Sequence, residues 1–320
     1  MKALRALFDL CRQSFESWRA DYAPSMGAAL AYYTVFSLAP LILIVISVVG
    51  LVFGRDEARG EIMEQISGLM GADGARAVQV MLEHLNRPAQ GIVATVAGIG
   101  LLIVGATTVF GELQDAFDRI WRAPARDDTN GLLNLVRTRL LSFSMIMGIG
   151  FLLMVSLIVN AALAALGEWW APYFGGWAHL AQNVNSAFGF AIVTVGFAMI
   201  FKVMPRVSVQ WRDVWIGAAV TAVLFTIGKY LIGLYIGKTG VASGYGAAGS
   251  LVVVLVWVYY SAQIFLLGVE FTWIYAHEYG SLKGRPRPGA LRSPTRADGA
   301  DSADGAGEPP GQPEKPPPSR

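Results

Sequence analysis

Residues 250–275 read SLVVVLVWVYYSAQIFLLGVEFTWIY and contain one charged residue, Glu270. A helix of about twenty residues rises about 30 Å, which matches the hydrocarbon thickness of a membrane. A core helix of a soluble domain does not need an apolar run of this length. The stretch therefore predicts a membrane-spanning helix.

Five other long apolar stretches, each with at most one charged residue, predict further spans. They cover about 25–53, 91–111, 140–166, 183–203 and 214–236. The composition agrees, because 54% of the residues are hydrophobic and 15% are charged, against about a quarter charged in soluble domains. The sequence predicts an all-α, multi-pass membrane protein whose six-helix domain occupies residues 23–280.

Three flanking segments have their own patterns. Residues 1–22 predict an amphipathic cytoplasmic or interfacial helix, which could lie along the lipid headgroups or pack against the end of the bundle. Residues 54–90 predict an extracytoplasmic loop holding two short amphipathic helices, broken at 71–74. Residues 281–320 hold nine of the fifteen prolines and no aromatic residue, and predict a disordered cytoplasmic tail.

The distribution of lysine and arginine predicts the orientation. Nineteen of these residues fall in the terminal segments and the second and fourth loops, and five fall in the other loops. Cytoplasmic loops of membrane proteins carry the excess of positive charge. Both ends are therefore predicted to be cytoplasmic, in a bacterial inner (plasma) membrane.

Polar residues inside the predicted spans are candidates for function, because each is costly in lipid unless it is paired. Tyr33 and Ser37 share a helix face, and Pro40 frees a backbone carbonyl. By depth, Ser37 and Gln263 both fall near the middle of the membrane, which makes a polar seam between the first and sixth spans possible. The candidates for a translocation path are Tyr33, Ser37, Pro40, Lys229, Tyr260, Gln263 and Glu270.

Two alternatives stay open for these side chains. They could instead hold helices together, and Lys229 could extend toward the outer headgroups or face a water-filled cavity. Glu112, Asp115, Arg119 and Arg122 share one face beyond the second span, which is typical of a salt-bridged interfacial helix.

Motifs for enzymatic chemistry are absent from the sequence. It has no P-loop, no GxSxG elbow and no GxGxxG after a strand. His84, His179 and His277 lie far apart without metal-ligand spacing. We therefore expect no enzyme activity, no cofactor, no metal site and no nucleic-acid binding.

Several short motifs together resemble the YihY/BrkB family of bacterial inner-membrane proteins, historically labelled ribonuclease BN. They are ALAYYTVFSLAP (29–40), LQDAFDRIW (113–121), Pro205, Trp211-Arg212-Asp213, Gly217-Ala218, YGAAGS (245–250), WVYYSAQI (257–264) and GVEF (268–271). The family usually has Asn where this chain has Asp118. The resemblance implies six membrane helices, an envelope role and no established biochemical activity.

Two functions fit these patterns. The first is a transporter or exporter of an unidentified small or lipid-like solute, with discontinuous or polar helices at the path. The alternative is a non-transporting envelope scaffold or regulator, whose basic cytoplasmic face would bind anionic lipids or partners and support envelope integrity. Ribonuclease activity is disfavoured.

Overall fold

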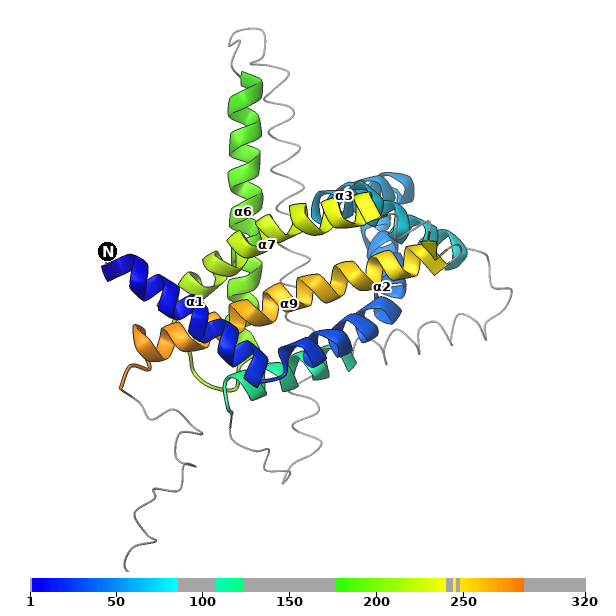
Figure 1. The fold of residues 1–320 in the computed structure, drawn as a ribbon. Helices are drawn as coiled ribbons and strands as arrows, with labels where there is room; N and C mark the ends of the chain where they lie inside the picture. Colours follow the sequence, from blue (N-terminus) through cyan, green and yellow to red (C-terminus); the bar gives the residue numbers. More distant parts are fainter. Residues whose placement is uncertain (1, 86–107, 124–176, 240–243, 246–247, 285–320) are drawn as a thin grey trace, which may run out of the picture. The chain divides into compact units, whose positions relative to one another are not determined.

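The computed structural model describes residues 2–85, 108–123, 177–239, 244–245 and 248–284, and all regular secondary structure in these ranges is helical. The all-α class is confirmed for these ranges. Residues 108–120 form one helix, called the 108–120 helix below. The others are α1 (Lys2–Ala20), α2 (Ala23–Phe53), α3 (Arg55–Leu85), α6 (Trp177–Val203), α7 (Trp211–Thr239) and α9 (Gly249–Glu278) (Figure 1).

Three helices in the described ranges are long and apolar enough to cross a membrane. They are residues Ser186–Val203 of α6, the whole of α7 and the whole of α9. In addition, α2 has 31 residues, none of them charged, and stays helical through Pro40. The spans predicted at 91–111 and 140–166, and the tail predicted at 281–320, lie largely or wholly outside the described residues.

Helices α7 and α9 pack as an antiparallel pair through two reciprocal contacts. Gly217 of α7 faces Thr272 of α9, and a side chain at Gly217 would overlap that threonine. Gly268 of α9 faces Thr221 of α7 in the same way. In lipid, such close backbone approach replaces the hydrophobic effect as the main source of helix association.

Each threonine also bonds within its own helix. The Thr221 hydroxyl donates to the Gly217 carbonyl and the Thr272 hydroxyl to the Gly268 carbonyl, both at 2.7 Å. Both threonines are fully buried, and these bonds satisfy their hydroxyl groups in the apolar core. The two Gly-xxx-Thr segments thus fit against each other without an unpaired donor.

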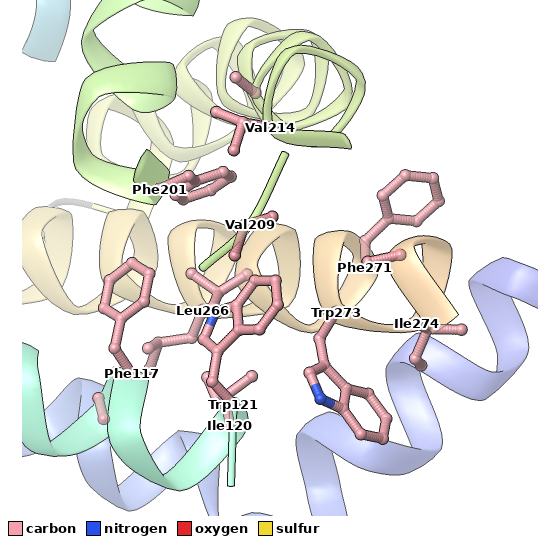
Figure 2. Packing of buried hydrophobic residues seen from close by; sticks show 14 of the residues in the cluster. Phe117, Ile120, Trp121, Phe201, Val209, Val214, Leu266, Phe271, Trp273 and Ile274 are labelled. Atoms are coloured by element: carbon pink, nitrogen blue, oxygen red, sulfur yellow. The ribbon is translucent and has the colours of Figure 1, made fainter. Parts of the chain in front are cut away.

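A cluster of buried apolar side chains joins α1, the beginning of α2, the 108–120 helix, the end of α6, the beginning of α7 and the C-terminal half of α9. We call it the Phe117 cluster (Figure 2). Its larger members are Leu10, Leu30, Phe117, Ile120, Trp121, Phe201, Val209, Val214, Leu266, Val269, Phe271, Trp273 and Ile274. Helix α1 and the end of α9 therefore lie at the same end of the bundle.

A second cluster joins α3 to α2, the C-terminal half of α7 and the beginning of α9. We call it the Val78 cluster, and its members are Val35, Ile42, Met70, Ala77, Val78, Leu82, Ile232, Ile236, Val253 and Val254. Because α7 and α9 are antiparallel, this cluster lies at the opposite end of the pair from the Phe117 cluster. Helix α3 thus covers the end of the bundle remote from α1.

The break predicted at 71–74 is found at Gly71, where two helical segments of α3 meet. Gly71 has φ 77° and ψ 171°, a conformation that is essentially restricted to glycine. The amphipathic helices expected on either side of the break are present in α3. Their extracytoplasmic location remains a prediction.

Replacing Gly71 with alanine should destabilise the protein by about 1–3 kcal/mol, because the new Cβ forces a strained backbone. The matched control is Gly68→Ala, at an open helical position where an added Cβ meets nothing within 4 Å. That change should be neutral or stabilise by about 0.5–1 kcal/mol. Thermal unfolding in detergent measures the stability of both variants. Equal effects would contradict the glycine-specific backbone conformation at Gly71.

Candidate functional site

A buried carboxyl, Glu270, lies on α9 where this helix passes the junction of α1 and α2. Glu270 has 0% exposed surface, and no nitrogen donor of the described residues bonds its carboxyl oxygens, so the Asp21 carboxyl is its hydrogen-bonding neighbour. Asp21, in the α1–α2 junction, has its Oδ2 buried with no donor from the same ranges. A charged group of this kind is costly in an apolar core unless something compensates it.

Two charged side chains act on Glu270 from other segments. Asp21 interacts most strongly and lies within hydrogen-bonding reach, and Arg122 follows. The three side chains come from the α1–α2 junction, the end of the 108–120 helix and α9. They form a cluster of two carboxyls and one guanidinium around the fully buried Glu270, which we call the Glu270 site.

The Arg122 side chain is positioned by its backbone and by a tryptophan. Arg122 lies in the turn two residues after the 108–120 helix and has φ 50°, a left-handed conformation that is uncommon for a non-glycine residue. Its guanidinium carbon lies 4.7 Å from the centre of the Trp273 ring, a favourable cation–π distance. Trp273 is one helical turn from Glu270, so this contact keeps Arg122 beside the carboxyl.

A second arginine and a second left-handed residue lie nearby. Tyr22, which precedes α2, has φ 59°. The Arg119 guanidinium carbon lies 5.2 Å from the centre of the Tyr22 ring. Arg119 and Arg122 therefore contact aromatic rings of other segments. The prediction of a salt-bridged interfacial helix did not include these contacts. The turn between α1 and α2 thus makes two contacts at the Glu270 site, since Tyr22 contacts Arg119 and Asp21 contacts Glu270.

Gln263 lies two helical turns from Glu270, on the same side of α9. Its Nε2 donates to the Pro24 carbonyl at 3.4 Å, and Gly27 leaves the space that its amide occupies. Its Oε1 is buried, and the described residues supply no donor to it. Gln263 and Glu270 thus place polar atoms in one strip beside the beginning of α2.

The register of α2 and α9 differs from the prediction. Gln263 lies beside Gly27, whereas Ser37 is ten residues further along α2, about 15 Å away at 1.5 Å per residue. Ser37 therefore does not face Gln263, and its hydroxyl donates to the Thr34 carbonyl of its own helix at 3.1 Å. Depth along each span could not reveal this offset, because α9 extends well beyond the beginning of α2 to pack against α1.

The other predicted path residues lie in different surroundings. Tyr33 makes an edge-to-face contact with Tyr32, and Tyr260 packs near Gly228 of α7. The Lys229 ammonium lies 3.4 Å from the Gly68 carbonyl of α3, at the Val78 end of the bundle. The side chain of Pro40 lies outside the described atoms. Of the seven candidates, the structure brings Gln263 and Glu270 together on one strip.

Sequence reasoning missed Asp21 and did not connect Arg122 to Glu270. Asp21 precedes Pro24 and the uncharged α2, which is an ordinary place for a polar residue at a membrane boundary. Arg122 follows a helix whose charges read as solvent-exposed. A buried carboxyl in the sixth span did indicate that a partner was needed, but the partner's identity depends on how α1 and the 108–120 helix pack against α9.

Asp118 of the 108–120 helix forms an ion pair. Its Oδ2 lies 3.1 Å from Nη2 of Arg206, and the two side chains are 18% and 28% exposed. The pair links the 108–120 helix to the segment between α6 and α7. The carboxylate at position 118 therefore has a structural role that an amide would only partly replace.

Asp118→Asn is expected to destabilise the protein by about 1 kcal/mol, since the pair is partly shielded from water. The control is Asp115→Asn, at an exposed position of the same helix. Thermal unfolding at low salt should show a gap between the unfolding temperatures of the two variants. This gap should narrow at about 1 M salt, where screening is strong. A salt-independent gap would rule out the ion pair as its cause.

The apolar helices, their glycine-mediated packing and the buried polar strip define a multi-pass membrane protein. The chain belongs to the family described as Virulence factor BrkB, which it matches over residues 14–292.

Relatives of this chain carry the name UPF0761 membrane protein. The one from Psychrobacter sp. (strain PRwf-1) is 27% identical over 272 residues, covering 83% of this chain and 48% of the relative. Those from Stenotrophomonas maltophilia (strain K279a) and Azotobacter vinelandii are each 28% identical, covering 77% and 82% of this chain and 56% and 62% of the relatives. The chain thus spans about half to three-fifths of their length. No solved structure matches it.

Proposed function

We propose that this chain crosses a bacterial inner membrane six times, with both ends in the cytoplasm, and transports a small or lipid-like solute. The shared position of α1 and the end of α9 in the Phe117 cluster supports an even number of crossings. A crossing at 91–111 would join α3, in the Val78 cluster, to the 108–120 helix, in the Phe117 cluster. The excess of positive charge supports the cytoplasmic assignment of the Phe117 end.

One observation carries the transport proposal. Gln263 places a buried Oε1 without a donor from the described residues into the strip of α9 beside the beginning of α2, and Glu270 adds a fully buried carboxyl whose hydrogen-bonding neighbour is the Asp21 carboxyl. Polar atoms at such a place in a membrane protein typically face a substrate, an ion or water. A purely structural helix interface would gain stability from apolar side chains there. The strip is therefore the best candidate for the wall of a polar path.

Vesicles test this proposal with two variants of the strip. Proteoliposomes are incubated with a labelled cell extract of metabolites and lipids, and mass spectrometry compares what wild type, Gln263→Leu, Glu270→Gln and empty vesicles accumulate. We expect at least one solute to enter with the wild type and to enter several-fold more slowly with each variant. The control is Gln79→Leu, an exposed glutamine of α3 bonded to Glu83, which should behave as wild type.

The same experiment separates transport from the alternative function. If wild-type and empty vesicles accumulate the same solutes, the transport proposal fails and a non-transporting envelope scaffold or regulator is favoured. If Gln263→Leu and Glu270→Gln transport at the wild-type rate, the path does not run along this strip. Thermal unfolding of each variant shows whether a lost flux reflects a lost fold.

A further inference from the structure

One face of α1 packs against the protein. Leu10 and Ser14 are buried, and Trp18 packs against the Phe117 cluster. The Ser14 hydroxyl donates to the Leu10 carbonyl at 2.7 Å, so the buried polar group on this face is satisfied. This face therefore needs no further partner.

The most apolar stripe of α1 points elsewhere. Leu7, Phe8 and Phe15 are 54%, 68% and 50% exposed, and Cys11 between them is also exposed. At 100° per residue, this stripe lies about a quarter turn around the helix from Leu10 and Ser14. Both phenylalanines of α1 are thus left largely uncovered by the protein, which points to a partner of another kind.

Arginines border this open stripe. Arg5, Arg12 and Arg19 recur every seven residues, so they form a row along the helix beside Phe8 and Phe15, and all three are exposed. Arg12 is also bonded to Glu16 at 2.8 Å. An apolar stripe bordered by guanidinium groups matches the boundary of a lipid layer, with acyl chains on one side and phosphates on the other.

The connection of α1 to α2 places this surface at the membrane. Helix α1 ends at Ala20, and the uncharged α2 begins at Ala23. Because the connection between the two helices is only two residues long, α1 stays close to the point where α2 enters the hydrocarbon. We propose that the open face of α1, made by Leu7, Phe8, Cys11 and Phe15 with Arg5, Arg12 and Arg19, binds the anionic phospholipid surface of the membrane.

The single cysteine of the chain provides the probe, since Cys11 lies on this face. A nitroxide label on Cys11 is compared in bilayers of phosphatidylcholine alone and of phosphatidylcholine with phosphatidylglycerol, using the full chain. Collisions with oxygen report lipid, and collisions with a nickel chelate report water. We expect oxygen to dominate, with a several-fold larger oxygen-to-nickel ratio in the anionic bilayer.

Two variants serve as controls. The Cys11→Ser/Asp9→Cys variant moves the label to an exposed position on another side of α1, where the nickel chelate should dominate. Changing Arg5, Arg12 and Arg19 to glutamine together should remove the difference between the two bilayers while the unfolding temperature stays close to that of the wild type. That result would assign the lipid dependence to the arginine row.

Two results would overturn the proposal. If nickel reaches the Cys11 label freely in both bilayers, the face lies in water. If the label is immobile and shielded from both reagents, a protein surface covers the face, either another part of this chain or a second copy. A bilayer difference that persists in the triple glutamine variant would also reject the role of the arginines.

Discussion

Valine at Gly268 is expected to lower the stability of the protein by about 1–3 kcal/mol or more, because its side chain would enter space that Thr221 occupies. Thr221 cannot easily turn away, since its hydroxyl bonds to the Gly217 carbonyl at 2.7 Å. Valine at Gly217 should have a similar effect through Thr272. Unfolding in detergent, followed by circular dichroism, measures both losses.

The control and a compensating change make this test specific. Gly233→Val lies on the same helix as Gly217, but an added Cβ there meets nothing within 4 Å. That variant should lose far less stability. The smaller change Gly268→Ala should also lower the stability. Adding Thr221→Ala to it should restore part of the loss, because it removes the Thr221 side-chain atoms that overlap the new Cβ. Equal losses at Gly233 and Gly217, or strictly additive effects of the paired changes, would show that α7 and α9 do not meet at these residues.

Asp213→Ala is expected to destabilise the protein by about 1–3 kcal/mol, because it leaves two partly buried donors of Ser281 without an acceptor. The Asp213 carboxylate is buried and accepts hydrogen bonds from the backbone N–H and the hydroxyl of Ser281, at 2.9 and 2.6 Å. It lies in the first turn of α7, where negative charge is favourable. The residue thus ties the beginning of α7 to the chain just after α9.

Hydrogen exchange gives a local measure of this tie. The Ser281 amide should exchange faster in Asp213→Ala than in the wild type, while amides in the middle of α7 stay unchanged. Asp213→Asn keeps an acceptor of the same size and should lose less stability, and Ser281→Ala should lose about 1 kcal/mol because one bond remains. An unchanged exchange rate at Ser281 would contradict the contact.

The two ends of the bundle differ in the polar contacts that they hold. The Phe117 end holds the Glu270 site, the Asp118–Arg206 ion pair and the Asp213–Ser281 contact. The Val78 end is covered by α3, whose Gly68 carbonyl accepts the bond from Lys229. Among the described residues, these three polar contacts between distant segments therefore lie at the end that the charge distribution assigns to the cytoplasm.

The span positions could be predicted because hydrophobic length is a local property. The spans predicted at 183–203, 214–236 and 250–275 correspond to α6 (Trp177–Val203), α7 (Trp211–Thr239) and α9 (Gly249–Glu278). Each helix extends a few residues past its apolar run, because backbone hydrogen bonding continues into the polar boundary. The break at Gly71 could likewise be predicted, since a glycine-rich interruption of an amphipathic pattern indicates a turn.

The contacts between helices could not be read in the same way. The facing pairs Gly217 with Thr272 and Gly27 with Gln263 depend on the register of one helix against another. Register in a membrane is set by where small residues let backbones approach, and many glycines in this sequence could have played that part. The seam between Ser37 and Gln263 that their depth made possible is not formed, for this reason.

What the sequence determined by itself is the all-helical membrane class, the position of the described apolar helices and the presence of a carboxyl within the sixth predicted span. Only the tertiary structure decided that Asp21 and Arg122 meet Glu270, and which face of α1 stays open. A run of apolar residues acts through its own length and composition. The surroundings of a buried charge or an exposed stripe depend on segments far away in the chain, whose approach is decided by the fit of side chains at the helix contacts.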